Sequence, residues 1–144
     1  MTRVIKQASV EYSAEQMFRL VNDIQSYPEF LPWCTATNIL EQRENALTAS
    51  VSIAVGKIKQ SFTTANAMQP YSSIQMDLVE GPFKELSGYW QFRDENGSCR
   101  VSLDMRFEFK NRLVKHALGA AFQKITNSLV DAFIDRAHHV YGNA

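Results

Sequence analysis

The segment from Arg112 to about Tyr141 carries apolar side chains at every third or fourth position, and this spacing constrains the fold more than any other feature. The apolar positions are Leu118, Phe122, Ile125, Leu129, Phe133, Ala137 and Val140. They line one face of a 3.6-residue helix, while the opposite face carries Lys115, Lys124, Asp131 and Asp135. At 1.5 Å per residue this helix would be roughly 45 Å long. It therefore needs a long partner to cover its apolar face.

Three small residues, Gly119, Ala120 and Ala121, lie in the middle of this predicted helix. Their side chains fill little of the space beside the helix axis. Two interpretations are open: the helix packs closely against a sheet at these residues, or a gap is left there for a ligand.

Apolar and polar residues alternate almost throughout the segment from Cys34 to Lys110, which predicts β-strands. The segment from Arg3 to Val10 alternates in the same way and predicts a first strand. Turn signals divide the longer segment at Gly56-Lys57, Pro70-Tyr71, Gly81-Pro82 and Asn96-Gly97. Short turns between consecutive strands predict an antiparallel meander with one apolar face.

Ser13 and Gln16 follow the first predicted strand with the spacing of a capping box, and Tyr12 and Met17 are placed as a hydrophobic staple. We therefore predict a helix that begins after Ser13. Its expected buried face consists of Met17, Leu20, Val21 and Ile24.

Four large apolar residues gather in a short segment that also contains Pro28 and Pro32. They are Tyr27, Phe30, Leu31 and Trp33. Pro28 ends or restarts the preceding helix, and the segment is too short for a long regular element. Two interpretations are open here as well: a lid on the core, or a mouth for a hydrophobic ligand or a membrane contact.

Together these elements predict an α+β fold, in which a curved antiparallel sheet wraps around the long C-terminal helix and two short helices follow the first strand. The chain has 144 residues and no linker or internal repeat, so we expect one domain over residues 1–144. Lys plus Arg and Asp plus Glu both number 15, so no overall field favours DNA, and any RNA contact would need a local patch. Neither a targeting peptide nor a membrane-spanning run is recognisable, and we expect a cytoplasmic protein.

Common enzyme motifs are not found in the sequence: there is no G-x-S-x-G, no G-x-G-x-x-G and no P-loop. We therefore expect neither catalysis nor a metal. The three histidines lie in the last predicted helix without the spacing of a metal-binding pair: His116, His138 and His139. Glu80 and Glu85 flank a turn and are weak acid–base candidates. Cys34 and Cys99 lack metal-like spacing and are predicted to be buried free thiols.

Three stretches carry a family resemblance: residues 27–34 (YPEFLPWC), 81–92 (GPFKELSGYWQF) and 107–111 (FEFKN). In this order they resemble the signature stretches of the coenzyme Q-binding START-like family, whose bacterial branch is named for the ribosome association toxin RatA. The resemblance spans essentially the whole chain. It implies the helix-grip fold of START and Bet v 1 domains, with a lipid-sized cavity between the sheet and the last helix. The sequence shows no mitochondrial presequence, so it resembles the bacterial branch.

The resemblance implies a non-catalytic protein that holds ubiquinone or a similar isoprenoid lipid, supports respiration and requires no cofactor beyond this ligand. The candidate cavity walls are Phe62, Met76, Leu86, Trp90, Phe107 and Phe122. Gln60 and Asn66 are the candidate donors to a quinone oxygen. The candidate mouth, which could also touch a membrane surface transiently, consists of Tyr27, Phe30, Leu31 and Trp33. For every one of these residues the alternative is ordinary core packing.

A second hypothesis follows from the name of the bacterial branch, which implies a toxin that binds the large ribosomal subunit and blocks subunit joining. The candidate contacts are Lys57 and Lys59 at one predicted hairpin, and Lys110, Arg112 and Lys115 at the start of the long helix. Their alternative is an ordinary solvated surface. A third hypothesis, a cyclase-like enzyme on the same fold, rests on fold analogy alone.

Overall fold

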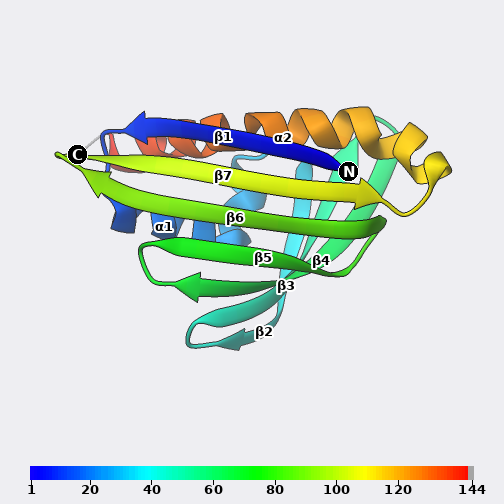
Figure 1. Ribbon diagram of the computed structural model, residues 1–144, viewed down its shortest axis with the longest axis horizontal. Helices are drawn as coiled ribbons and strands as arrows, with labels where there is room; N and C mark the ends of the chain where they lie inside the picture. Colours follow the sequence, from blue (N-terminus) through cyan, green and yellow to red (C-terminus); the bar gives the residue numbers. More distant parts are fainter. Residues whose placement is uncertain (143–144) are drawn as a thin grey trace.

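The long helix lies along one face of a curved antiparallel sheet in the computed structural model, which describes residues 1–142 (Figure 1). The elements in chain order are β1 (Thr2–Val10), α1 (Ala14–Asn22), η1 (Ile24–Glu29), β2 (Cys34–Arg43), β3 (Ala46–Val55), β4 (Ile58–Gln69), β5 (Ser73–Glu80), β6 (Phe83–Glu95), β7 (Ser98–Phe109) and α2 (Arg112–Tyr141). The seven strands are ordered β1-β7-β6-β5-β4-β3-β2. The predicted meander and helix-grip architecture are confirmed.

The first strand closes one edge of this sheet by pairing with the last strand. Thr2 lies opposite Phe107 and Val10 opposite Cys99, so β1 and β7 are joined along almost their whole lengths. This pairing brings the start of α1, which follows β1, to the end of the sheet near the last turns of α2. Both cysteines are buried and free, as predicted.

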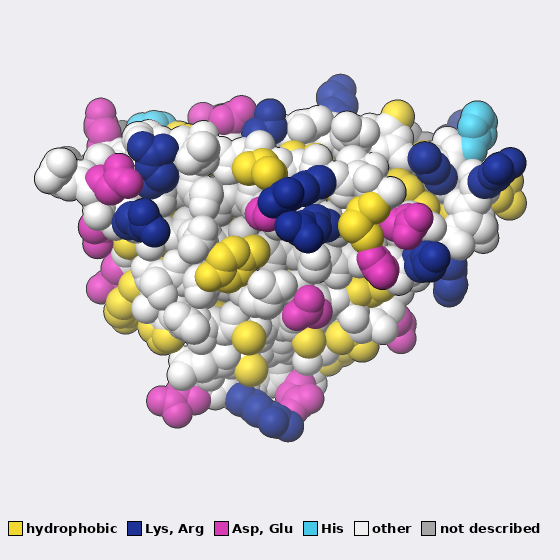
Figure 2. All heavy atoms as spheres, in the orientation of Figure 1, with side chains coloured by type: hydrophobic (Ala, Val, Ile, Leu, Met, Phe, Trp, Pro, Cys, Tyr) yellow, Lys and Arg dark blue, Asp and Glu magenta, His cyan; other side chains and the backbone are white. Residues whose placement is uncertain are grey.

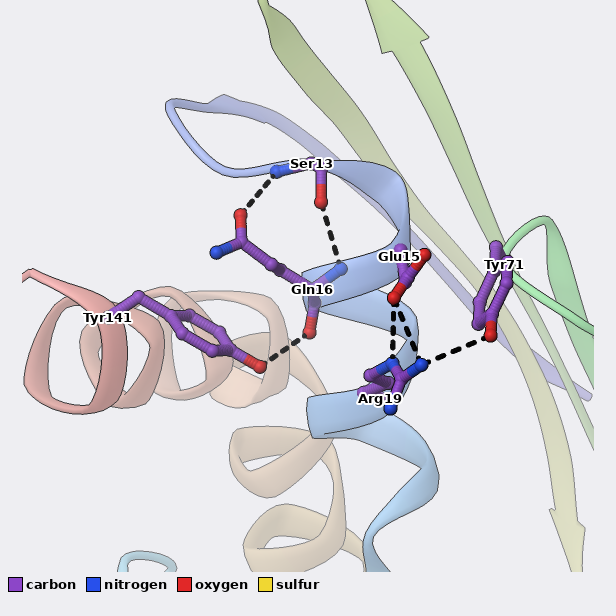
Figure 3. A network of polar contacts seen from close by, with 6 residues as sticks. All are labelled: Ser13, Glu15, Gln16, Arg19, Tyr71 and Tyr141. Atoms are coloured by element: carbon purple, nitrogen blue, oxygen red, sulfur yellow. Dashed lines mark hydrogen bonds and ion pairs between the residues drawn. The ribbon is translucent and has the colours of Figure 1, made fainter.

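Helix α1 begins with the predicted capping box. Ser13 Oγ accepts a hydrogen bond from the Gln16 amide at 3.1 Å, and Gln16 Oε1 accepts one from the Ser13 amide at 2.8 Å. Two further contacts hold this helix in place (Figure 3): the Tyr141 hydroxyl donates to the Gln16 carbonyl at 3.0 Å, and Arg19 Nη2 donates to the Tyr71 hydroxyl at 3.1 Å. Helix α1 is therefore linked to the end of α2 and to the β4–β5 turn.

The buried face of α2 follows the predicted stripe for most of its length. Its buried residues are Leu118, Phe122, Ile125, Thr126, Val130, Phe133 and Ala137. The prediction was wrong for Val140, which is 47% exposed, and Leu129 is only half-buried. In the last turn the half-buried side chain of Tyr141 packs against the core in place of Val140, because Tyr141 lies one full turn after Ala137.

The segment around Pro28, which was expected to be too short for a long regular element, is partly helical. The 3₁₀-helix η1 includes Tyr27 and Pro28, so Pro28 lies inside a short helix and does not end one. The predicted buried face of the first helical region, Met17, Leu20, Val21 and Ile24, is buried as expected. Within residues 1–142, the helices fall short of the length and apolarity needed to cross a bilayer.

Candidate functional site

A small cavity of about 90 Å³ lies between the concave face of the sheet and α2. Helix α2 contributes Phe122, Ile125, Thr126, Leu129 and Phe133 to its wall. The strands contribute mostly apolar side chains: Ala49, Val51, Phe62, Thr64, Asn66, Met76, Leu86, Gly88, Trp90 and Met105. Ile24 and Tyr27 of η1, together with Trp33, complete it. Gly119, Ala120 and Ala121 do not line the cavity, which lies beside the turns of α2 that follow them. A Cβ atom at Gly119 would lie 3.7 Å from Phe109 Cε2, so the helix packs closely against the sheet there and the interpretation of a gap at these residues was wrong.

The volume of the cavity limits what this conformation can hold. An engineered cavity of about 150 Å³ in another protein accommodates benzene, and typical ligand pockets enclose about 300–1,000 Å³. At about 90 Å³, the hollow is smaller than either. A ligand larger than a few waters therefore requires some of the wall side chains to move.

Most of the predicted wall residues meet at this cavity. Phe62, Met76, Leu86, Trp90 and Phe122 line it. Phe107 does not line it: its side chain is 1% exposed, and its ring lies 4.8 Å from that of Phe122. Phe107 pairs with Leu86 across the sheet and packs behind Phe122, so it belongs to the core that supports the wall.

The two predicted polar residues lie toward different ends of β4, and only one of them reaches the cavity. Asn66 is 5% exposed and lines the cavity, whereas Gln60 is exposed and lies in an outer groove with Lys59. Gln60 lies near the β3–β4 turn, opposite Ile53, whereas Asn66 lies six residues further along β4, opposite Met76. Gln60 therefore does not line the cavity, and the prediction that it donates to a ligand held there was wrong.

The Asn66 side chain is held by a hydrogen bond from a neighbour on the same strand. Its Oδ1 accepts a hydrogen bond from Thr64 Oγ1 at 2.8 Å. Its Nδ2 donates to no group in residues 1–142. The nearby Thr126 hydroxyl donates to the Gln123 carbonyl at 3.0 Å. The wall thus offers a hydrogen-bond donor in otherwise apolar surroundings.

The predicted mouth is only partly at the cavity. Tyr27 and Trp33 line it, while Phe30 lies beside it with its ring 5.4 Å from that of Phe133. Leu31 is fully buried, because backbone hydrogen bonds with Tyr27 and Cys34 turn it inward, so it forms no part of a mouth. The Tyr27 hydroxyl donates to the Val21 carbonyl, and burial raises the pKa of Tyr27.

Arg136 joins η1 to α2, and no motif in the sequence indicated this residue. Its guanidinium carbon lies 4.9 Å from the centre of the Phe30 ring, and its Nη2 lies 3.5 Å from Glu29 Oε1. The side chain is only 17% exposed, and its buried Nε has no hydrogen-bond partner in the described residues. Sequence analysis also missed Ala49, Val51, Gly88 and Met105, although the period-two pattern of β3 could have indicated the first two.

Of the predicted basic residues, three share one surface groove. Lys110, Arg112 and Lys115 lie in it together with Lys84, which was not predicted. Lys57 lies in the β3–β4 turn and Lys59 at the start of β4, outside this groove.

The weaker chemical candidates lie away from the cavity. Glu80 and Glu85 are exposed and do not line it. All three histidines are exposed, with His138 Nδ1 2.8 Å from the Tyr12 hydroxyl. Across residues 1–142, no three His, Cys, Asp or Glu side chains are grouped closely enough to hold a metal ion.

Comparison with known proteins places the chain in a family. Residues 10–134 match the family described as polyketide cyclase / dehydrase and lipid transport. The ribosome association toxin RatA of Pseudomonas aeruginosa is 44% identical over 142 residues, which cover 98% of this chain and 99% of that protein. The chain belongs to this family, in its RatA branch.

The chain is more distantly similar to a mitochondrial protein of Xenopus laevis named as a coenzyme Q-binding protein. That protein is 25% identical to this chain over 136 residues, which cover 91% of the chain and 56% of the relative. The resemblance inferred from residues 27–34, 81–92 and 107–111 is confirmed at the level of the family.

Solved structures share the fold at low sequence identity. A protein of Thermus thermophilus superposes with a TM-score of 0.83 at 16% identity, covering 97% of this chain and 99% of that one. The Zhui aromatase/cyclase of Streptomyces sp. R1128 superposes with a TM-score of 0.79 at 15% identity, covering 95% and 93%. At these identities the likeness concerns the fold alone.

Proposed function

We propose that this protein of the RatA branch binds a hydrophobic ligand with a polar ring, ubiquinone or a similar isoprenoid quinone, between α2 and the sheet. It would act as a non-catalytic carrier that supports respiration, with no cofactor besides this ligand. The observation that carries the proposal is a cavity with mostly apolar walls that include the amide side chain of Asn66, whose Nδ2 has no hydrogen-bond partner in residues 1–142. A quinone carbonyl is an acceptor that such a donor can bind, while the ring and tail suit the surrounding aromatic and methionine side chains.

The groups around the cavity favour binding over acid–base chemistry. Among the lining residues, the titratable side chain is Tyr27, whose pKa is raised by burial and whose hydroxyl already donates to Val21. A general acid or base works best with a pKa near the operating pH, which this tyrosine does not have. The shared fold with an aromatase/cyclase is therefore not accompanied by a suitable general acid or base among the residues that line this cavity.

The small volume of the cavity means that the proposed ligand can bind only if the walls move. Since about 90 Å³ is too small for a quinone ring with its tail, binding must be coupled to expansion of the walls. Met76 and Met105 are suited to this because unbranched thioether side chains change rotamer easily and fit irregular spaces. The loaded protein should therefore differ from this conformation mainly in these side chains and their neighbours.

Extraction of the purified full chain with organic solvent, followed by mass spectrometry, tests the proposal directly. We expect an isoprenoid quinone at a substantial fraction of the protein concentration. Asn66→Ala should lower the quinone content by up to about ten-fold, since a hydrogen bond contributes about 0.5–1.5 kcal/mol. Asn127→Ala, which changes an exposed residue on α2, is the matched control.

Trp90→Ala separates a cavity wall from ordinary core. A close-packed tryptophan would cost about 3–5 kcal/mol of unfolding free energy on truncation. Because Trp90 borders the hollow, we expect a smaller loss together with a loss of quinone. The proposal is wrong if the purified protein carries no isoprenoid lipid, or if Trp90→Ala greatly destabilises a protein whose lipid content stays the same.

We infer a second candidate function, association with the large ribosomal subunit and inhibition of subunit joining, from the names of the relatives and from Lys110, Arg112 and Lys115. These three side chains lie in one groove and form no ion pair within residues 1–142. Phosphate contacts weaken steeply with salt, so co-sedimentation with ribosomal subunits should fall across a salt series. Finding the protein only at the top of the gradient at low salt would remove this candidate.

A further inference from the structure

One end of the molecule combines unpaired cations with an exposed leucine, and we call this set the basic tip: Lys84, Lys110, Arg112, Lys115 and Leu113. The four cations line a common groove at the junction of β6, β7 and α2. The Lys110 amide donates to the Pro82 carbonyl at 3.1 Å, which holds the end of β7 beside the start of β6. Figure 2 shows Lys and Arg side chains gathered at the right-hand end, where β7 runs into α2 in Figure 1.

The charge of the basic tip is not neutralised by the protein itself. None of its four cations takes part in an ion pair within the described chain; the ion pairs found there all involve other arginines. Glu108 lines the same groove, and Glu85 follows Lys84 in sequence and pairs with Glu108 across the sheet. Four side-chain cations thus face two carboxylates, which leaves the surface positive.

The position of these cations opposes local helix stability. Arg112 is the first residue of α2, and the first turn contains no acidic residue. The positive end of the helix dipole lies there, so cations are disfavoured by a few tenths of a kcal/mol or more and anions are favoured. A departure of this kind from local rules is typical of surfaces that serve an interaction.

Leu113 adds an exposed apolar group next to Arg112, at the start of α2. Its side chain is 79% exposed, more than any other large hydrophobic side chain in residues 1–142. It follows Arg112 in sequence and lies beside the groove that the four cations line, and the exposed Met1 borders that groove. A single exposed leucine needs no explanation, but one next to a groove lined by four cations can present an apolar group and positive charge to the same partner.

We propose that the basic tip docks on the surface of an anionic phospholipid bilayer, with Leu113 inserted among the lipid headgroups. Cations near such a surface are attracted by its negative potential, and an apolar side chain gains by leaving water for the boundary of the acyl chains. RNA would supply phosphates but no apolar phase for Leu113, so the bilayer accounts for both features. The inference rests on the proposed function, because a carrier of an isoprenoid ligand must meet the membrane that holds it.

Co-sedimentation of the full chain with vesicles tests this docking. We expect binding to phosphatidylcholine vesicles that contain phosphatidylserine, weaker binding to phosphatidylcholine alone, and release at high salt. Leu113→Ser should lower the partition coefficient about ten-fold, and each cation removed should lower it about five-fold. Lys110→Glu with Arg112→Glu should therefore abolish measurable binding. Leu40→Ser, at a leucine 57% exposed on β2, and Lys124→Glu, on the exposed face of α2, are matched controls that should bind like wild type.

Several outcomes would overturn the docking proposal without contradicting the proposal that the cavity binds a quinone. One is equal binding to anionic and neutral vesicles at low salt. Another is a loss with Leu40→Ser as large as that with Leu113→Ser. A third is wild-type vesicle binding by Leu113→Ser, with charge reversal reducing binding to ribosomal RNA instead, which would assign the surface to nucleic acid. Asn66→Ala should lose quinone and keep vesicle binding, so failure of the docking and failure of the proposed function are measured separately.

Discussion

Replacing Gly88 by alanine tests whether the space between α2 and the sheet is a hollow. Gly88 lies in β6, opposite Met76 on β5 and Met105 on β7, and all three residues line the cavity. A Cβ atom at Gly88 would overlap the terminal Cε of Met76 and lie 3.1 Å from Met105 Sδ. Both obstacles are the far ends of flexible side chains that border empty space.

The expected effect of Gly88→Ala is the sum of two small terms. Alanine in a strand interior gains about 0.5–1 kcal/mol over glycine because the unfolded chain loses conformational freedom. Moving Met76 into the cavity costs about 0.5–1.5 kcal/mol if its side chain leaves a preferred rotamer. We therefore expect the unfolding free energy to stay within about 1 kcal/mol of wild type. A close-packed site would instead lose about 1–3 kcal/mol from overpacking.

Gly81→Ala is the control, because there the neighbours cannot move. Gly81 has φ +154°, and a Cβ atom would lie 2.7 Å from Phe62 Cβ and 3.3 Å from Phe62 Cα. Strain at such a backbone angle and contact with another strand should cost about 2 kcal/mol or more. Urea denaturation with unchanged m-values measures both variants against wild type. If Gly88→Ala is as destabilising as Gly81→Ala, the space beside Gly88 is filled and the cavity argument fails.

Three further predictions concern the supports of the fold. Ser13→Ala removes the cap of α1 and should lower the unfolding free energy by about 1 kcal/mol in urea denaturation, and an unchanged value would contradict the role of the cap. Burial raises the pKa of the Cys34 and Cys99 thiols, so neither should react with iodoacetamide at neutral pH until the protein unfolds; mass spectrometry showing alkylation of the native protein would refute this. The hydrogen bond from Arg3, and then its charge, lower the pKa of Asp104, so the pair stabilises the fold above the usual pKa of aspartate, and this stabilisation is lost as the pH falls through the lowered pKa. Arg3→Ala should therefore lower the unfolding free energy slightly at neutral pH and almost not at all in acid, and equal losses at both pH values would exclude this linkage.

Local patterns in the sequence determined most of the architecture. The 3.6-residue spacing placed α2, the period of two placed the strands, and Ser13 with Gln16 marked the start of α1. Each of these signals depends on residues within a few positions of one another. They were readable without the rest of the chain because helix faces, strand faces and caps are set by backbone geometry alone.

The candidate site was predicted less completely, because it depends on contacts between distant segments. Gln60 and Asn66 occupy equivalent positions in the alternating pattern of β4, yet Gln60 lies near the exposed β3–β4 turn and only Asn66 reaches the cavity. Phe107 has the same alternation as Met105, but Phe122 covers it. Leu31 was expected at a mouth, and its backbone hydrogen bonds turn it into the core.

The sequence by itself determined that a long amphipathic helix would be held in a curved antiparallel sheet, and its three motifs indicated the family. Only the tertiary structure decided the volume of the hollow, the place of Asn66 in its wall, the contacts of Arg136 with Phe30 and Glu29, and the meeting of Lys84 with the start of α2. The physical reason is that periodicity specifies which face of an element is apolar. How closely two apolar faces approach depends on strand register and on side chains brought together from distant parts of the chain.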